Sequence, residues 1–390
     1  MPEEILIDHY DYSLPEDRIA QEAAEPRDSS RLLLYKQGQI SDHRFTELSR
    51  FLPDGTSLFL NNAKVIPARL ILNNSTGARI EVFLLQPEGA DHVTALNAIG
   101  TVSWNCLIGN RKKWKAGELL QTRVGNTLLV LTLAGEQTVR FEWDSTEAFA
   151  ELIALFGSLP LPPYIKHKAE AYDRERYQTV YSAVSGSVAA PTAGLHFSDA
   201  VINSLENAGI PMHYVTLHVS AGTFLPVKVN DALQHPMHSE CFTVDAEQIR
   251  AVRDAEKTVA VGTTSCRVLE SLYWGAVNLH EDRPDPFNIA QFDYRNRREI
   301  FDRAAAMDFL LNYLEQRGEH VLSGASSIMI VPGYKFRVTE GLITNFHQPK
   351  STLLLLISAL LGDDWKKVYK HALDNGYRFL SYGDSSLLLP

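Results

Sequence analysis

Apolar and polar residues alternate in short runs between residues 56 and 143 of the chain. Within this stretch, Ile80, Val82 and Leu84 fall on one side of an extended segment, because successive side chains of a strand point to opposite faces. Gly125 and Gly135 interrupt the alternation and mark turns. Short strands joined by tight turns predict a small antiparallel barrel or sandwich.

Beyond residue 157 the pattern changes to alternating strands and helices. Extended apolar runs predict strands at 214–219, 258–261 and 327–331. Apolar residues at helical spacing predict helices after Ser198, after Gly262, over 306–314 and from Leu353. This alternation is typical of an α/β fold, and we expect a mostly parallel sheet with flanking helices.

The β-rich stretch lies inside the α/β sequence, because segments of α/β type precede and follow it. We therefore expect a discontinuous α/β domain formed by residues 1–60 and 158–390, with residues 61–157 inserted as a small antiparallel β-barrel-like domain. The charged segment 281–303, which carries two prolines, is expected to form a surface loop.

Composition narrows the classes of protein that the chain can belong to. Its 390 residues contain no run of about 20 apolar residues and no basic, then apolar, leader, so we expect no membrane association and a cytoplasmic location. The three cysteines are an odd number without a CxxC pair, which argues against a disulfide framework and against a zinc site. Nothing resembles a coiled coil, so we expect a monomer.

The net charge of −10 limits how the chain could bind nucleic acid. Proteins that hold long duplexes usually carry an excess of Lys and Arg, because phosphate neutralisation supplies much of the affinity. Any contact with nucleic acid must therefore use a local basic patch. Arg111 and Lys112, next to Trp114, form one such patch, although a solvated loop between strands would look the same.

Four polar or glycine-rich loops occupy positions where open α/β sheets bind ligands, at the carboxyl ends of strands. They are residues 190–197, 220–224, 262–264 and 344–351. Three of them lead into expected helix N-termini, where free backbone N–H groups and the helix dipole favour a carboxylate or a phosphate. Four such loops in one sheet predict a ligand site.

Several long segments of unusual composition run in one order through the chain: DYSLPEDRIAQ (11–21), LNNAKVIPARL (60–70), RYQTVYSAVSGSVAAPTAGLHFS (176–198), VGTTSCRVLES (261–271) and LITNFHQPKSTLLLL (342–356). In these segments the chain resembles the S-adenosylmethionine:tRNA ribosyltransferase-isomerase family of queuosine biosynthesis. Ser220 and Gln348 stand where the family usually has Gly and Leu, which indicates a divergent member.

The resemblance implies an enzyme that consumes S-adenosylmethionine as a co-substrate and needs no metal. Its ribosyl group would be transferred to 7-aminomethyl-7-deazaguanine at the wobble position of a tRNA with a GUN-type anticodon. Isomerisation would give epoxyqueuosine with release of adenine and methionine. The alternatives are an S-adenosylmethionine-dependent RNA methyltransferase, whose glycine-rich turn is missing from the sequence, and a non-catalytic RNA-binding protein.

The implied chemistry needs proton transfers near neutral pH, for which histidine is the usual side chain. The catalytic candidates are His196, His218 and His347, although His218 would equally suit a buried core position. His238 and Glu240 could share one face of an extended segment, where a hydrogen bond is a better interpretation than a metal site. We expect His196, His218, Gly262 and His347 to converge on one pocket.

Further candidates come from the family segments and from aromatic residues that alternate with basic ones. Substrate contacts are expected from Asp28, Arg31, Thr192, Gly194, Gly222, Thr223, His238, Glu240, Gly262, Thr263, Thr264, Asn345, Lys350, Tyr382 and Asp384. Contacts to tRNA are expected from Tyr164, Lys166, Arg176, Tyr177, Arg111 and Lys112. Unpaired bases of an anticodon loop could stack on such aromatic rings.

Overall fold

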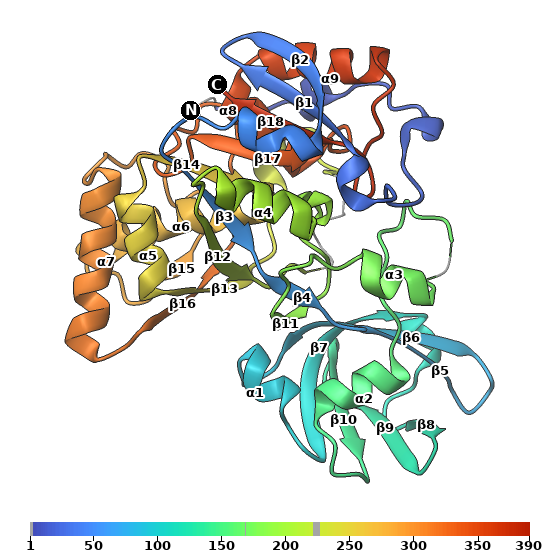
Figure 1. Cartoon of the computed structure of the whole chain (residues 1–390). Coiled ribbons are helices and arrows are strands. Elements are labelled where there is room, and N and C mark those ends of the chain that lie inside the picture. The colour runs from blue at the N-terminus through green and yellow to red at the C-terminus, as the bar shows by residue number, and fades with distance from the viewer. Residues whose placement is uncertain (1–2, 168, 221–226) are drawn as a thin grey trace.

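The computed structural model describes residues 3–167, 169–220 and 227–390 (Figure 1). In this part of the chain, ten strands form a mixed sheet and six others form a second sheet. The strands of the large sheet have the order β15 (Asn288–Ile289), β16 (Val321–Ser326), β13 (Glu240–Asp245), β12 (Met212–Leu217), β3 (Thr56–Asn61), β14 (Lys257–Val261), β17 (Gly341–Asn345), β18 (Ser385–Leu389), β1 (Arg31–Lys36) and β2 (Gln39–Arg44). The four central strands, β12, β3, β14 and β17, all run parallel.

Both faces of the large sheet are buried, as a parallel sheet requires. Leu58 and Leu60 of β3 pack into one core, while Phe59 between them packs into another. The core around Phe59 includes residues of α5 (Ala246–Asp254), α6 (Gly262–His280), α7 (Arg303–Arg317), α8 (Thr352–Leu361) and α9 (Asp364–Asp374). The core around Leu58 and Leu60 includes residues of α4 (Asp199–Asn207).

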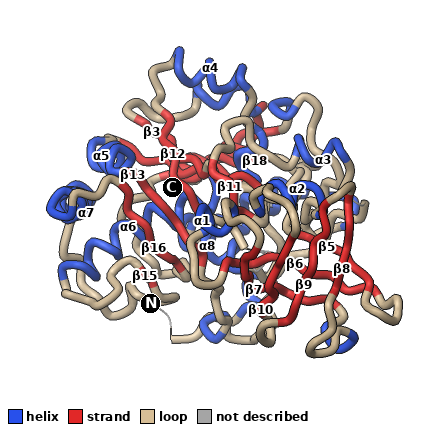
Figure 2. Tube along the Cα trace, turned by 90° about the horizontal axis from the view of Figure 1, so that it is seen from below, coloured by secondary structure: helices blue, strands red, loops and turns tan. Residues whose placement is uncertain are grey.

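The second sheet is antiparallel, and Figure 2 shows it set to one side of the large sheet. Its strands have the order β5 (Arg69–Asn73), β6 (Arg79–Pro87), β7 (Thr101–Gly109), β10 (Thr138–Trp143), β9 (Thr127–Leu133) and β8 (Leu120–Val124). The edge strands β5 and β8 contact each other, so the sheet is nearly closed into a barrel. Ile80, Val82 and Leu84 are completely buried on one face, as their alternation predicted.

The fold class is therefore the expected one: an α/β sheet with flanking helices and a small antiparallel barrel. The six-stranded sheet has its own buried core, to which α2 (Phe149–Phe156) contributes. On this support we propose residues 61–157 as a domain inserted between 1–60 and 158–390. A short parallel pair, β4 (Ala63–Val65) with β11 (Val184–Ser187), joins the segments that enter and leave it. The remaining helices are α1 (His92–Leu96) and α3 (Ala171–Arg176).

Two predictions about local structure were wrong. The strand expected at 327–331 lies earlier, at β16, and the following residues form a buried loop that packs through Ile328 and Ile330. The segment 281–303 is more than a surface loop, because its strand β15 extends the edge of the large sheet and Asp293 and Tyr294 are buried. Burial explains the apolar run that suggested a strand at 327–331, and the N–H groups of Ser327 and Met329 still donate to the carbonyls of Ile289 and Gln291.

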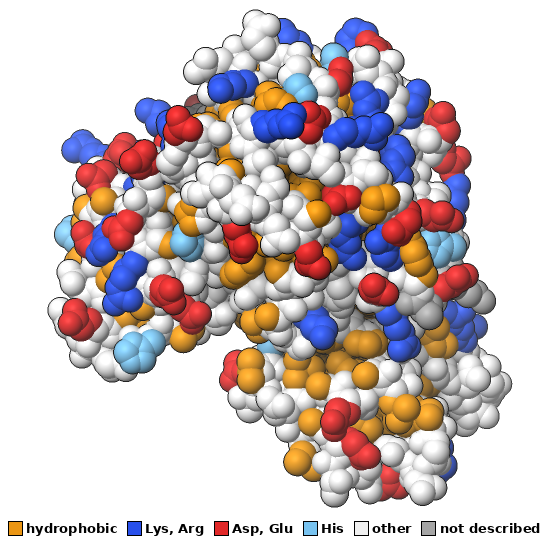
Figure 3. Space-filling view, viewed as in Figure 1, with side chains coloured by type: hydrophobic (Ala, Val, Ile, Leu, Met, Phe, Trp, Pro, Cys, Tyr) orange, Lys and Arg blue, Asp and Glu red, His pale blue; other side chains and the backbone are white. Residues whose placement is uncertain are grey.

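Charges are mixed over the surface of the molecule. On the face shown in Figure 3, Lys and Arg side chains are interspersed with Asp and Glu side chains. Among the described helices, none is long and apolar enough to cross a membrane.

Candidate active site

A cavity lies at the carboxyl edge of the central parallel strands. Val261, the last residue of β14, is in register with Ile343 near the end of β17, so the loops that follow both strands open at one edge. The cavity has an empty volume of about 740 Å³. Its walls include, among the predicted site residues, Thr192, Gly262, Thr263, Thr264, Asn345, His347 and Tyr164.

Two helix N-termini border this cavity. The 19-residue helix α6 begins there, and Thr263 and Thr264 of its first turn line the wall. Helix α8 begins beside it, where Ser351 caps the helix by accepting a hydrogen bond from the N–H of Leu354 at 3.2 Å. Thr264 is buried, and its Oγ1 has no partner among the described residues. Such ends attract anions, because their N–H groups and dipoles point outward.

Gly262 sets the turn from β14 into α6. Its φ is +87°, a left-handed backbone conformation that side chains with a Cβ rarely adopt. A Cβ built there would lie 3.6 Å from Cβ of Ala193 and 3.4 Å from Oγ1 of Thr264, which are ordinary contacts. The glycine is therefore required by the backbone conformation more than by lack of space.

The variant Gly262→Ala is expected to lower the free energy of unfolding by about 1–2 kcal/mol, the usual cost of a left-handed non-glycine residue. Urea titration of the variant and the parent protein measures this change. Gly209 has a φ of +70° and a Cβ added there would have nothing within 4 Å, so Gly209→Ala is a matched control for strain alone. Only Gly262→Ala should also weaken ligand binding. Equal binding by both variants would contradict the role of this turn.

Asn345 presents an unused acceptor at the cavity wall. Its Nδ2 donates to Nε2 of His196 at 3.2 Å and to the carbonyl of Leu380 at 3.0 Å. These two bonds fix the orientation of the amide, because Nδ2 must be the donor to the carbonyl. The side chain is 2% exposed, and its Oδ1 has no partner among the described residues. This oxygen is therefore an unused acceptor buried in the cavity wall.

His196 lies behind Asn345 and is not part of the cavity wall. Its Nδ1 is 2.8 Å from Oγ of Ser30, and its ring packs against Phe45. Because Nε2 accepts from Asn345, the proton is assigned to Nδ1, which donates to Ser30. Burial lowers the pKa of His196 to about 3, so the ring is neutral at pH 7. His196 can thus position Asn345, but it does not reach the cavity itself.

His347 lines the cavity directly. Its Nε2 is 2.9 Å from Oγ1 of Thr344, and its backbone N–H donates to the hydroxyl of Tyr369 at 3.1 Å. The hydroxyl of Tyr12 donates to its carbonyl. Burial lowers the pKa of His347 below its ordinary value. The ring is therefore neutral at pH 7, and Thr344 is its side-chain partner.

His218 is not brought together with the other two histidines. Its ring stacks on His92 of α1, with centroids 4.3 Å apart and an angle of 20° between the planes. Gly186 packs against both rings, since a Cβ there would come within 2.8 Å of His218. The next residue, Val219, lines the cavity, but His218 itself does not. The expectation that all three catalytic candidates share one pocket was wrong: His347 lines the cavity, His196 lies behind Asn345, and the side chain of His218 contacts the barrel side of the molecule.

The stacked pair should make stability depend on pH. Burial lowers the pKa of His92 to about 4 and that of His218 to about 3. In the unfolded chain both titrate near 6.5, so stability is complete above that pH and is lost as the pH falls from about 6.5 towards 4 and 3. As the pH falls from 6.5 to 5, each of the two histidines should lower the free energy of unfolding by up to about 2 kcal/mol, because the unfolded chain takes up a proton that the folded ring does not. The variant His92→Phe should lose less stability between pH 7 and 5 in urea titrations, and an equal loss would contradict this prediction.

Glu240 belongs to a buried ionic cluster beside the cavity. The Arg267 guanidinium pairs with Glu240, His238 Nε2 lies 3.0 Å from Glu240 Oε1, and the N–H of Ser220 donates to the same oxygen at 2.8 Å. Burial alone would raise the pKa of Glu240, but Arg267 and these hydrogen bonds bring it to about 2. A smaller hollow against His238 and Arg267 shares Leu353 with the cavity. The predicted residues His238 and Glu240 thus lie next to the cavity without lining it.

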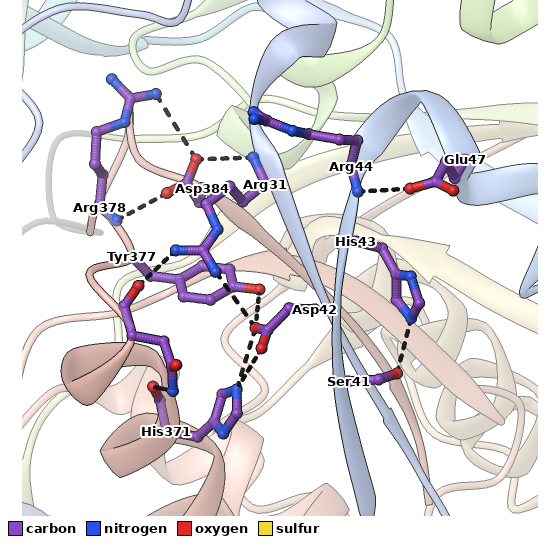
Figure 4. A network of polar contacts seen from close by, with 11 residues as sticks. Arg31, Ser41, Asp42, His43, Arg44, Glu47, His371, Tyr377, Arg378 and Asp384 are labelled. Carbon is purple, nitrogen blue, oxygen red and sulfur yellow. Dashed lines mark hydrogen bonds and ion pairs between the residues drawn. The ribbon is translucent and has the colours of Figure 1, made fainter.

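Four other predicted residues join strands and loops outside the cavity. Figure 4 shows that Asp384 accepts from the N–H groups of Arg31, at 2.9 Å, and of Arg378, at 2.8 Å. The Arg31 guanidinium lies 3.8 Å above the ring of Tyr377. Asp28 accepts from the hydroxyl of Ser198, the N-cap of α4, and Tyr382 donates to Asp173 at 2.9 Å. The contacts of these four residues connect segments of the chain to one another, and none of the four lines the cavity.

The remaining substrate candidates also differ in their positions. Gly194 packs under Tyr181, because a Cβ there would lie 2.0 Å from its hydroxyl oxygen. Lys350 pairs with Asp8 at 2.7 Å and with Asp11 at 3.1 Å, which directs its amino group to the N-terminal segment. Gly222 and Thr223 lie outside the described residues.

The residues predicted to contact tRNA are spread over the molecule. Tyr164 lines the cavity, and its hydroxyl is 2.5 Å from Oγ of Ser381. Tyr177 is completely buried, so no base can stack on it, and its predicted tRNA contact is not supported. Lys166 is exposed and pairs with Glu16, while Arg176 is largely covered and bonds to the carbonyl of Ala24. Arg111 and Lys112 lie on a short turn of the six-stranded sheet.

Sequence reasoning missed four residues that complete the site. Ser30 holds His196, Thr344 holds His347, Ser381 lies on the cavity wall next to Tyr164, and Arg267 neutralises Glu240. Arg267 and Thr344 lie within segments that carry the family resemblance, and Thr344 precedes Asn345. Their partners are 166, 3, 217 and 27 positions away, respectively, so for three of them no local pattern could have indicated the contact.

Comparison with known proteins gives one consistent result. The model of a family described as queuosine biosynthesis protein matches residues 7–388. A protein named S-adenosylmethionine:tRNA ribosyltransferase-isomerase from Zymomonas mobilis is 37% identical over 98% of this chain and 99% of its own length. A protein of the same name from a Ruegeria species is 40% identical over 98% of this chain and 99% of its own length. Among solved structures, S-adenosylmethionine tRNA ribosyltransferase from Thermotoga maritima is 27% identical over 97% of this chain and 99% of that chain, with a TM-score of 0.47.

Proposed function

Because the chain belongs to the queuosine biosynthesis protein family, we propose that its cavity binds S-adenosylmethionine beside a modified base of tRNA. The protein is a transferase and isomerase of tRNA modification, with S-adenosylmethionine as its co-substrate. The ribosyl group moves to the aminomethyl nitrogen of 7-aminomethyl-7-deazaguanine and rearranges to epoxyqueuosine. Adenine and methionine leave, so all atoms of the co-substrate are accounted for.

One observation supports this use of the cavity most strongly: two helix N-termini and Asn345, whose buried Oδ1 has no partner among the described residues, border the same space. The start of α6, with Thr263 and Thr264, suits the carboxylate of the methionyl group. Asn345 Oδ1 suits an N–H donor, either of the adenine or of the attacking amine. The ring of Tyr164 can face the sulfonium, which favours an aromatic surface.

Within the cavity we assign proton transfer to His347, the histidine that lines it. The sulfonium acidifies the C5′ protons, and a neutral imidazole can accept one of them. His196 acts through Asn345 and is a positioning residue. Thr344 holds the ring of His347 in one orientation, which is what a proton acceptor at a fixed distance needs.

The proposal also covers the tRNA substrate, the oligomeric state and the cellular location. We propose a tRNA with a GUN-type anticodon, bound by a monomer in the cytoplasm, where tRNA is modified. The support for this partner is the tRNA named in the description of the relatives.

Incubation with S-adenosylmethionine and tRNA that carries 7-aminomethyl-7-deazaguanine tests this function. Release of free adenine and methionine is expected, with the tRNA gaining one ribosyl-derived group by mass spectrometry. A methyltransferase would release S-adenosylhomocysteine instead, and a non-catalytic RNA-binding protein would release neither product. Either of these outcomes would overturn the proposal.

A further inference from the structure

A second hollow in the molecule is strongly basic. It has an empty volume of about 1660 Å³ and is separate from the cavity, with which it shares no lining residue. We call it the basic groove; its lining residues are Glu3, Trp274, Tyr294, Arg295, Asn296, Arg297, Arg298, Glu299, Gly333, Tyr334, Lys335 and Arg337. Arginines and a lysine thus outnumber the two glutamates, in a chain whose net charge is −10. Such a local excess of cations is unexpected unless it serves an anionic partner.

Arg297 is held in a fixed position on the groove wall. It donates to Asn278 Oδ1 at 2.7 Å and pairs with Glu281 at 2.7 Å, while its guanidinium lies 5.4 Å from the ring centre of Trp274. Asp293, which is buried, lies 3.5 Å away and supports the same guanidinium. The segment that contributes these groups is largely 281–303, so its folded structure builds one wall of the groove.

Arg298 and Lys335 are the cations that remain available. Both are exposed, and within the described residues neither has an ion-pair or hydrogen-bond partner. Arg337 pairs with Glu299, whose carboxylate is 61% exposed at the groove. Two unpaired cations beside a weakly held acidic rim are suited to bind phosphates, which can also compete with Glu299 for Arg337.

The groove lies at a defined distance from the cavity. Trp274 on its wall follows Gly262 by twelve residues along α6, which corresponds to about 18 Å of helix. The smaller hollow next to the cavity is lined by Met329 and Ile330, and the same loop continues to Lys335 in the groove. The cavity and the groove thus border two points of one helix that lie about 18 Å apart along its axis.

We propose that the basic groove binds the sugar–phosphate backbone of the tRNA substrate while the modified base occupies the cavity. This inference rests on the proposed function and adds a second contact surface to it. Binding at the groove is independent of base sequence, since its cations meet phosphates, and it supplies affinity while the cavity supplies recognition of the base. The segment 281–303 then has a function in substrate binding.

Charge reversal tests the groove. The double variant Arg298→Glu/Lys335→Glu should raise the Kd for precursor tRNA about tenfold and reduce the slope of log Kd against log salt by about 2, one for each lost phosphate contact. The single variant Glu299→Gln should tighten binding, because Arg337 is released. The KM for S-adenosylmethionine should not change in either variant, since the groove does not line the cavity.

A matched control is the double variant Lys366→Glu/Lys370→Glu on the exposed side of α9, where both side chains are more than half exposed. It should leave the tRNA affinity within about twofold of the parent, because long-range charge effects are screened by salt. Normal adenine release with unchanged tRNA affinity in the groove variant would overturn this inference and leave the proposed function intact. Weakened binding by the groove variant, in a parent protein that releases no adenine, would instead support the groove and overturn the proposed function.

Discussion

The variant Asn345→Ala is expected to lower kcat/KM for adenine release about 10²–10³-fold, the usual loss when one preorganised hydrogen-bonding group of an active site is removed. The amide is fixed by His196 and by the carbonyl of Leu380, and its buried Oδ1 has no partner among the described residues, although Asn345 lines the cavity. Because the amide of Asn345 is already oriented, no free energy is needed to order it when the ligand binds. A discontinuous assay of free adenine at several substrate concentrations measures the change.

Asn61→Ala is the matched control, because Asn61 is another buried asparagine at the end of a central strand, with its amide bonded to the backbone of Leu217 and Ala63. It should cost stability and leave the activity per folded molecule nearly unchanged. If Asn61→Ala lost as much activity as Asn345→Ala, a general loosening of the strand ends would explain both results and the role of Asn345 would be refuted.

A double-mutant cycle extends this prediction to His196. His196→Ala should reduce activity to a similar degree as Asn345→Ala, since it removes one of the bonds that fix Asn345 Nδ2 and leaves Ser30 without His196. Because the two residues act as one unit, the double variant should lose about as much as either single variant. If the activity losses of the two single variants added up in the double variant, His196 would not act by positioning Asn345 and would have a direct role.

Hydrophobic patterning in the sequence predicted most of the strands, the loops that follow them and the buried face of the six-stranded sheet. The strand-to-loop transitions at Gly262 and Asn345 follow from apolar runs that end in small or polar residues, and parallel strands must bring such loops to one edge. The structure places both at the cavity. The alternation of Ile80, Val82 and Leu84 similarly identified the buried face of the six-stranded sheet.

Side-chain partners could not be predicted in the same way. His218 follows directly after β12, and whether its side chain meets the cavity or His92 depends on how the inserted sheet packs against this strand. Tyr177 lies among basic residues that suggested an exposed platform, yet it is completely buried and its ring meets Tyr382 edge-on. Contacts between segments that are far apart in sequence decide both cases, and hydrophobic patterning does not encode them.

Replacement of Arg267 by Met is expected to lower the free energy of unfolding by about 3–5 kcal/mol at pH 7, because it leaves the buried carboxylate of Glu240 without its cation. Arg253→Met is the control, since Arg253 pairs with Asp308 at 3.0 Å on the surface and its loss should lower the free energy of unfolding far less. Urea titrations of both variants provide the comparison. Equal costs would refute the importance of the buried pair.

The pH dependence distinguishes loss of the ion pair from simple loss of packing. In the parent protein the pKa of Glu240 is about 2, below the unfolded value of about 4.3, so its contribution to stability is present above that value and is lost as the pH falls towards 2. Without Arg267, burial should raise the folded pKa above the unfolded one, and stability should then increase as the pH falls and the carboxyl group is protonated. The difference in stability between Arg267→Met and the parent should therefore shrink from pH 7 to pH 4. A difference that stays constant over this range would show that Arg267 contributes through packing, and Glu240 would then have to be stabilised by His238 and Ser220 alone.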